Sequence, residues 1–147
     1  MKYGIALGAL NVRSHLDATF EAERLGFESV WLPEHLVFTR TMTSSPHPGE
    51  NIPPVPPDLP IFDAFAYLGF LAARTERIRL GTHVYNLGLR HPFTSARGAL
   101  TVDYLSGGRF EFGIGASWGG YESLVVPTEP QQFRADPSRW PADPKEN

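Results

Sequence analysis

Two clusters of polar side chains contain groups that could act on a bound ligand. Glu34 and His35 directly follow an apolar run, where a histidine can transfer a proton near neutral pH or contact a cofactor ring. Tyr85, Asn86 and Arg90 follow a second apolar run, and an amide with a guanidinium suits an anionic or heteroaromatic ligand. Each cluster also has a structural interpretation, in which His35 bonds nearby backbone and Arg90 pairs with a surface carboxylate. The residues alone leave both interpretations open.

A glycine-rich segment provides a third candidate. Gly113 and Gly115 stand before Ser117 and Trp118, and glycine allows a backbone to approach a ligand closely. The pattern resembles the start of a dinucleotide-binding fingerprint, but its third glycine, Gly119, falls one position late. No acidic residue follows at a strand end about 20 positions later, as such a site requires. A Rossmann-like nucleotide-binding site is therefore a minor alternative to a close-packed turn.

The apolar periodicity predicts four strands that alternate with three helices. The strands are expected over residues 3–7, 27–32, 78–85 and 110–114, and the helices over residues 14–25, 62–74 and 94–105. This alternation predicts a parallel sheet with helical crossovers, and a spacing of about 30 residues per unit is typical of a (β/α)8 barrel. We therefore predict an α/β fold, a partial (β/α)8 TIM barrel with four parallel strands. The polar clusters would then meet at the carboxyl ends of the strands, where such barrels bind ligands.

Local signals refine the helices. Ser14 is expected to cap the first helix and Thr94 or Ser95 the third, while Gly26 and Gly107 are placed to end them. The side chains expected to face the sheet are Leu16, Phe20 and Leu25 in the first helix and Phe62, Phe65, Ala66, Gly69, Phe70 and Ala73 in the second.

The remaining polar residues favour structural roles. Asp103 and Arg109 lie at the amino-terminal side of the fourth predicted strand, so we expect them to fix a helix end there. We expect His91 in a turn that leads into a helix, and His83 to point into the barrel or towards a helix. His35, His83 and His91 lack the spacing of zinc motifs, so no metal site is expected.

Composition and charge exclude several classes of function. The 13 basic and 16 acidic residues give a net charge of −3, which provides no footprint for nucleic acid or an anionic membrane. The chain has no cysteine, which excludes disulfides and thiolate sites, and no apolar run long enough for a membrane helix. We therefore expect a cytoplasmic protein. Prolines concentrate in two stretches, so we expect a half-barrel over residues 1–120 and a proline-rich irregular tail over residues 121–147.

Several segments together resemble the luciferase-like monooxygenase family, which includes bacterial luciferases, alkanesulfonate monooxygenases and coenzyme F420-dependent oxidoreductases. The matching segments are residues 22–35 (AERLGFESVWLPEH), 78–82 (IRLGT), 90–92 (RHP), 103–110 (DYLSGGRF) and 113–118 (GIGASW). Their order and spacing are similar to those of the family over residues 2–120.

The resemblance implies a barrel that binds FMN or F420 at its carboxyl-terminal mouth. It implies hydride transfer or monooxygenation of a small organic substrate, with His35 as a catalytic residue beside the cofactor ring or the substrate. The residues implied to bind the cofactor are Tyr85, Asn86 and Leu87, in a bulge after the third strand that often contains a non-proline cis peptide, and Gly115 and Ser117 at the rim of the fourth strand. The residues implied to bind substrate are Glu34 and Trp118.

The chain departs from this family after residue 118. Members continue into four more strands, and the phosphate cradle of such barrels follows strands seven and eight. We therefore expect a truncated form that becomes an oxidoreductase only after self-association or completion by another chain. Unpaired strand edges likewise predict a homo-oligomer or a completing partner. The alternative is a non-catalytic half-barrel remnant that dimerises or binds flavin weakly.

Overall fold

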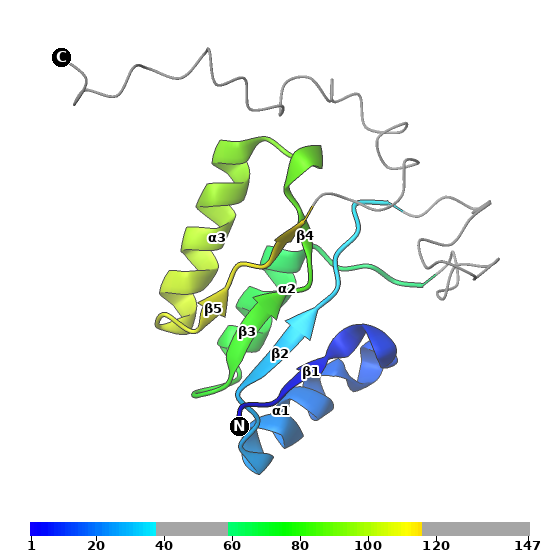
Figure 1. Ribbon diagram of the computed structural model, residues 1–147, viewed down its shortest axis with the longest axis vertical. Coiled ribbons are helices and arrows are strands. Elements are labelled where there is room, and N and C mark those ends of the chain that lie inside the picture. The colour runs from blue at the N-terminus through cyan, green and yellow to red at the C-terminus, as the bar shows by residue number, and fades with distance from the viewer. Residues whose placement is uncertain (38–58, 116–147) are drawn as a thin grey trace.

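The computed structural model describes residues 1–37 and 59–115, in which strands and helices alternate along the chain (Figure 1). The strands are β1 (Gly4–Ala6), β2 (Ser29–Leu32), β3 (Arg79–Thr82), β4 (Tyr85–Asn86), β5 (Phe110–Glu111) and β6 (Ile114–Gly115). The helices are α1 (His15–Leu25), α2 (Ala64–Ala72) and α3 (Pro92–Ser106), and short 3-10 helices occupy Leu7–Ala9, Val12–Ser14 and Leu87–Leu89.

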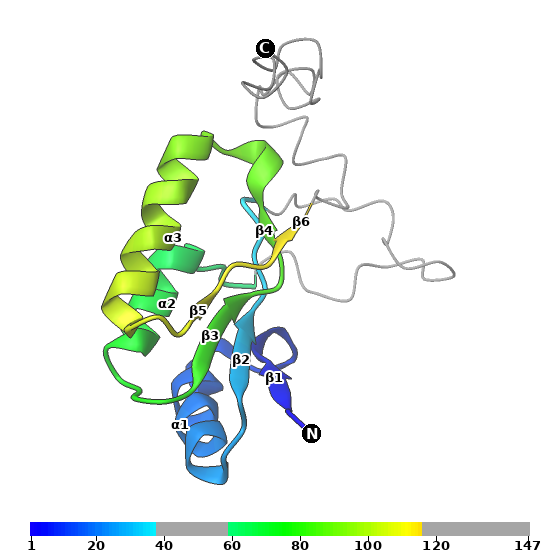
Figure 2. The same cartoon turned by 60° about the vertical axis from the view of Figure 1, so that its left-hand side comes forward.

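Four strands form one parallel sheet in the order β1-β2-β3-β5, and β4 and β6 form a second parallel pair. Each helical crossover carries the chain back to the amino-terminal end of the sheet. The next strand of the larger sheet then pairs in parallel beside the previous one. Figure 2 shows the three helices gathered on one side of the strands. The predicted α/β fold, a partial TIM barrel with four parallel strands, is confirmed. No helix in the described ranges is long and apolar enough to cross a membrane.

The hydrophobic core lies between the larger sheet and the helices. Val30 and Leu80 are paired in register and form one buried cluster with Leu68 and Leu71 of α2. Burying each of these side chains contributes roughly 1.5–3 kcal/mol. The core therefore holds the β2–β3 pair, and with it the residues that follow both strands.

The predicted end of α1 is confirmed, and Ser14 lies at its N-cap position as predicted, but the predicted start of α3 is wrong. Gly26 has a φ of +80° and ends α1 as expected. Ser14 makes no capping hydrogen bond, because the turn before it is already helical and is capped by Asn11. Helix α3 begins at Pro92, before residues 94–95, since the fixed φ and missing N–H of proline suit the first helical position.

The predicted sheet-facing sides of α1 and α2 are wrong at most positions. Phe20, Leu25, Phe62 and Phe70 are exposed. The buried residues are His15, Thr19 and Ala22 in α1 and Ala64, Leu68, Leu71 and Ala72 in α2. Small and aliphatic side chains let the helices lie close to the sheet, and of the predicted positions Leu16 and Phe65 do pack against the core.

The third and fourth predicted strands are each interrupted. β3 ends at Thr82, a cis peptide bond joins His83 to Val84, and β4 begins at Tyr85. Gly113 lies between β5 and β6, and its carbonyl oxygen accepts the N–H of Tyr85 (2.7 Å) and the hydroxyl of Thr82 (2.8 Å). The two interruptions are therefore bonded to each other, so the two strands change course together.

The face of the sheet away from the helices is dominated by Trp31. Its ring lies against Gly81, where a Cβ atom would come within 2.4 Å of it, and its indole N–H donates to the hydroxyl of Ser29 (2.9 Å). His83 meets the Trp31 ring edge-on, with 6.4 Å between the ring centroids. His83 therefore lies towards the barrel interior, the first of the two expected positions, and not towards a helix.

Arg109 and Glu23 tie the elements together at the amino-terminal edge of the sheet. Arg109 follows Gly107, which ends α3 with a φ of +68° as predicted. Its guanidinium donates to the carbonyl oxygens of Ala72, Thr75, Ile78 and Ser106 and to the hydroxyl of Thr75. The carboxylate of Glu23 accepts the backbone N–H groups of Glu76 (3.0 Å), Arg77 (2.6 Å) and Ile78 (2.9 Å). These contacts confirm the structural role predicted for Arg109.

Glu23 should make the stability of the fold depend on pH. Burial raises the pKa of its carboxyl, but the three N–H groups outweigh burial, so the pKa lies below its usual value. The resulting stabilisation is complete above the unfolded-state pKa of about 4.3 and is lost as the pH falls through the folded-state pKa. We expect Glu23→Gln to lower the free energy of unfolding by about 1 kcal/mol at neutral pH, and by less at a pH below the unfolded-state pKa of about 4.3.

Urea unfolding of both proteins at the two pH values measures this difference. Glu21→Gln is the control, because Glu21 pairs with Arg24 on the exposed surface of α1, where an ion pair contributes little to stability. A deficit in Glu23→Gln that does not change with pH would contradict the assignment.

Candidate active site

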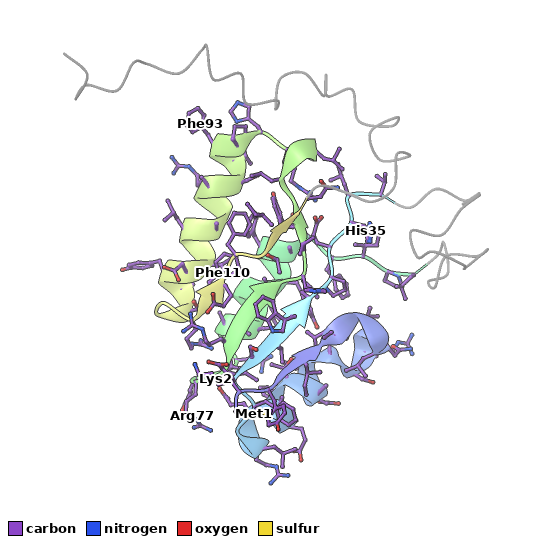
Figure 3. The ribbon with its side chains drawn as sticks, in the orientation of Figure 1. Met1, Lys2, His35, Arg77, Phe93 and Phe110 are labelled. Carbon is purple, nitrogen blue, oxygen red and sulfur yellow. The ribbon has the colours of Figure 1, made fainter. Side chains whose placement is uncertain are left out.

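The polar clusters that follow β2 and β3 lie at the carboxyl ends of these strands. Figure 3 shows His35 beyond the tip of β2, at the end of the sheet opposite to Lys2 and Arg77. β2 and β3 remain paired as far as Leu32 and Thr82, so the residues after both strands leave the sheet at the same edge. This is the edge at which parallel barrels bind their ligands.

The carboxylate of Glu34 is the centre of this cluster. One of its oxygens accepts the backbone N–H of Asn86 (3.0 Å) and an N–H of Arg90 (3.2 Å), and the other oxygen accepts the second N–H group of Arg90. The side chain of Glu34 is 1% exposed and that of Arg90 15%. The structural interpretation of Arg90 as a surface ion-pair partner is therefore wrong, because its carboxylate partner is buried.

Tyr85 turns its ring away from the strand ends and into the core. The ring packs beside Phe65 and Phe112, with centroids 4.8 and 5.3 Å away, and its hydroxyl lies 3.1 Å from that of Ser95. The guanidinium of Arg90 lies over the ring, 4.5 Å from the centroid. Any contact of Tyr85 with a cofactor would therefore come from its backbone, and cofactor binding by this residue stays a prediction.

The bulge that follows β3 offers an apolar, open surface beside these buried groups. Val84 is exposed, Leu87 is half-buried, and a Cβ atom built at Gly88 meets nothing within 4 Å. The bulge includes the cis peptide between His83 and Val84, the kind of bond that the resemblance implied for this place. His35 is half-buried at the neighbouring strand end, and its catalytic role stays a prediction.

Close packing between strands accounts for Gly113 and Gly115. A Cβ atom at Gly113 would lie 2.1 Å from the carbonyl oxygen of Thr82, and one at Gly115 would lie 2.4 Å from a methyl group of Val84. Nothing in this packing favours a phosphate site, so the Rossmann-like alternative loses its basis. Ser117 and Trp118 lie outside the described residues, and their predicted cofactor and substrate contacts stay predictions. The described ranges contain no group of three or more His, Cys, Asp or Glu side chains that could hold a metal ion.

The structure thus brings together Glu34, Tyr85, Asn86 and Arg90, and places His35 beside them. The pairing of Glu34 with Arg90 was not predicted. The available signal was a pair of opposite charges, each a few residues beyond an adjacent strand. The carboxylate of Glu34 bonds to the backbone of Asn86 and to Arg90, and the substrate contact expected of it stays a prediction.

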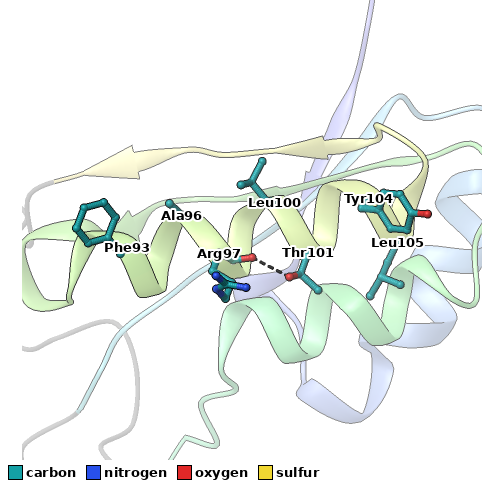
Figure 4. A pocket seen from close by; sticks show the side chains of 7 residues that line it. All are labelled: Phe93, Ala96, Arg97, Leu100, Thr101, Tyr104 and Leu105. Carbon is teal, nitrogen blue, oxygen red and sulfur yellow. Dashed lines mark hydrogen bonds between the residues drawn. The ribbon is translucent and has the colours of Figure 1, made fainter.

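A separate apolar hollow runs along the outer side of α3 (Figure 4). It is lined by Phe93, Ala96, Arg97, Leu100, Thr101, Tyr104 and Leu105. The Thr101 hydroxyl donates to the carbonyl of Arg97 in the same helix (2.7 Å), while Phe93 and Tyr104 are 80% and 87% exposed. This hollow lies on one helix, away from the strand ends and without converging polar side chains, so we do not take it as the active site.

Comparison with known proteins agrees with this picture. The model of the luciferase-like monooxygenase family matches residues 3–136. A 4-hydroxyprotoasukamycin monooxygenase of Streptomyces nodosus subsp. asukaensis is 35% identical over 64% of the chain. An F420-dependent glucose-6-phosphate dehydrogenase of Beutenbergia cavernae is 36% identical over 71% of it. The crystal structure of a monooxygenase from Streptomyces bottropensis superimposes with a TM-score of 0.64 at 26% identity, covering 92% of this chain.

The chain spans only part of each of these proteins. The matches cover 20% of the Streptomyces nodosus enzyme, 27% of the Beutenbergia enzyme and 39% of the Streptomyces bottropensis structure. The matched part therefore corresponds to less than half the length of each relative.

The packing at Gly113 predicts that even one methyl group is destabilising there. Gly113→Ala places a Cβ atom against a backbone carbonyl that cannot rotate away, so we expect the free energy of unfolding to fall by ~2–3 kcal/mol. Gly88→Ala is the control, because its Cβ atom would meet open space. Equal stability of the two variants in urea unfolding would show that Gly113 is not packed as described.

Proposed function

Because the chain belongs to the luciferase-like monooxygenase family, we propose that it forms the ring-binding part of an FMN- or F420-dependent oxidoreductase. The isoalloxazine or deazaflavin ring would lie against the backbone of residues 84–88, with His35 beside it. The observation that carries this proposal is that the end of β2 and the bulge that follows β3 lie together at the ligand-binding edge of a parallel barrel. Glu34 joins the two segments through its bonds to Asn86 and Arg90.

The residues of the bulge fit a flat heteroaromatic ring better than they fit a phosphate. The open side of Gly88 and the apolar Val84 and Leu87 leave a surface against which a ring could stack. Arg90, the cation nearest to the bulge in sequence, is already paired with Glu34. We therefore propose that this part of the chain holds the ring, and that the phosphate is held elsewhere.

The bound cofactor supplies the redox chemistry, either hydride transfer or the activation of oxygen. The chain would orient the ring, exclude water from one side of it, and hold or move a proton at the imidazole of His35. Gly115 and Ser117 would complete the rim beside the cofactor, and Trp118 would contact a small organic substrate. The F420-dependent relative from Beutenbergia supports F420, and the Streptomyces relative supports monooxygenation.

We also propose that further polypeptide covers the surfaces left open here, either in a homo-oligomer or from a completing chain. The free edges of β1 and β5, the Trp31 face of the sheet and the apolar side of α3 are all uncovered within the described ranges. A parallel sheet normally has both faces covered. The lack of cysteine supports the cytoplasm as the place where the protein works.

Thermal unfolding with each candidate cofactor tests ring binding. A ligand present at about 100 times its Kd stabilises the native state by roughly 2.7 kcal/mol, so either F420 or FMN should raise the midpoint of a cooperative transition. Riboflavin, which lacks the phosphate, should act nearly as well as FMN if the chain holds the ring. An unchanged midpoint with all three compounds would refute the proposal. Stabilisation by FMN but not by riboflavin would show that binding depends on the phosphate and not on the ring.

The proposed position of His35 can be tested by titrating the preferred cofactor against His35→Ala. Loss of one hydrogen bond of about 1–1.5 kcal/mol to the ring should raise the Kd roughly tenfold, as measured by quenching of cofactor fluorescence. His91→Ala is the matched control, since His91 precedes the first turn of α3 and lies outside the proposed site. Equal affinities of the two variants would remove His35 from the ring site.

A further inference from the structure

We propose that Glu34 and Arg90 act as one positioning unit that sets the course of the backbone at the ring platform, defined as residues 84–88. In this role neither side chain contacts the ligand; the pair acts through the backbone of Asn86. We call this pair, together with its bonds to the Asn86 backbone, the clamp. The clamp rests on contacts within the chain, and its effect on the cofactor rests on the proposed function.

Both polar backbone groups of Asn86 are held by this pair. Glu34 accepts the N–H of Asn86 (3.0 Å), and Arg90 donates an N–H to the carbonyl oxygen of the same residue (3.1 Å). The two side chains are also joined to each other by two N–H groups. The orientation of the peptide groups on either side of Asn86 is therefore fixed by a charged pair whose members come from two different segments.

The Glu34–Arg90 pair connects the segments after β2 and β3, beyond the point where the backbones of these two strands stop pairing. β2 and β3 are hydrogen-bonded up to Leu32 and Thr82, and beyond that point β4 pairs with β6 instead. Glu34, two residues past the end of β2, then provides a side-chain link to the departing segment. This link therefore ties β4 to the β2 side, in addition to its backbone bonds on the β6 side.

The environment of the pair makes its two members dependent on each other. Glu34 is almost completely buried, and the Arg90 guanidinium both pairs with this carboxylate and lies over the Tyr85 ring. A buried ion whose partner has been removed is strongly unfavourable, whereas loss of both partners is much less so. A lysine at position 90 would keep the charge but could not make the two-pronged contact of a guanidinium.

Hydrogen exchange of the platform amides tests the clamp without any ligand. We expect Glu34→Gln and Arg90→Lys to accelerate exchange in residues 84–88 at least tenfold, while the amides of β2 and α2 keep their protection. Glu111→Gln is the matched control, because it breaks the half-exposed ion pair with Arg79 on the same sheet and should leave the platform unchanged. The double variant Glu34→Gln/Arg90→Met should be more stable than Arg90→Met alone.

The outcomes separate the clamp from the proposed function. Faster platform exchange, together with at least a tenfold higher Kd for FMN or F420, supports both. Faster exchange in a protein whose wild type binds neither cofactor would support the clamp and refute the ring site. Platform exchange within twofold of the Glu111→Gln control in both single variants would overturn the clamp, whatever the cofactor does.

Discussion

The pairing register of the parallel strands is the constraint on which the rest of the structure depends. Since Leu32 lies opposite Thr82, the residues beyond β2 and β3 emerge side by side although about 50 positions separate them. Glu34 can then reach Asn86 and Arg90, and Gly113 can accept two hydrogen bonds from the segment around the β3–β4 break. A shift of one residue would turn the core side chains to the other face of the sheet and separate these polar contacts.

The helices cover only one face of this sheet in the described part of the chain. Val30 and Leu80 point towards α2 and are fully buried, whereas Trp31 and the Arg79–Glu111 pair lie on the opposite side. Residues 84–88 are therefore supported by the core on the helix side, and no helix of the described residues covers the opposite face of the sheet. The relatives are several times longer than the part that this chain matches.

The sequence was sufficient for features set by local chemistry or by simple repetition. The alternation of apolar runs predicted the parallel half-barrel, and Gly26 marked a helix end because a left-handed residue is needed there. The buried sides of the helices could not be predicted, since they depend on how closely each helix approaches the sheet. The Glu34–Arg90 pair was missed for a related reason: it exists only once β2 and β3 are known to be neighbours.

The contact between Trp31 and Gly81 has a consequence for how this family of sequences can diverge. The two positions are paired across β2 and β3, and the indole fills the space that a side chain at position 81 would need. The volume of this layer is thus shared by two residues, so neither can change size alone. Homologues with a larger residue in place of Gly81 are expected to carry a smaller one in place of Trp31, and the two substitutions should be inherited together.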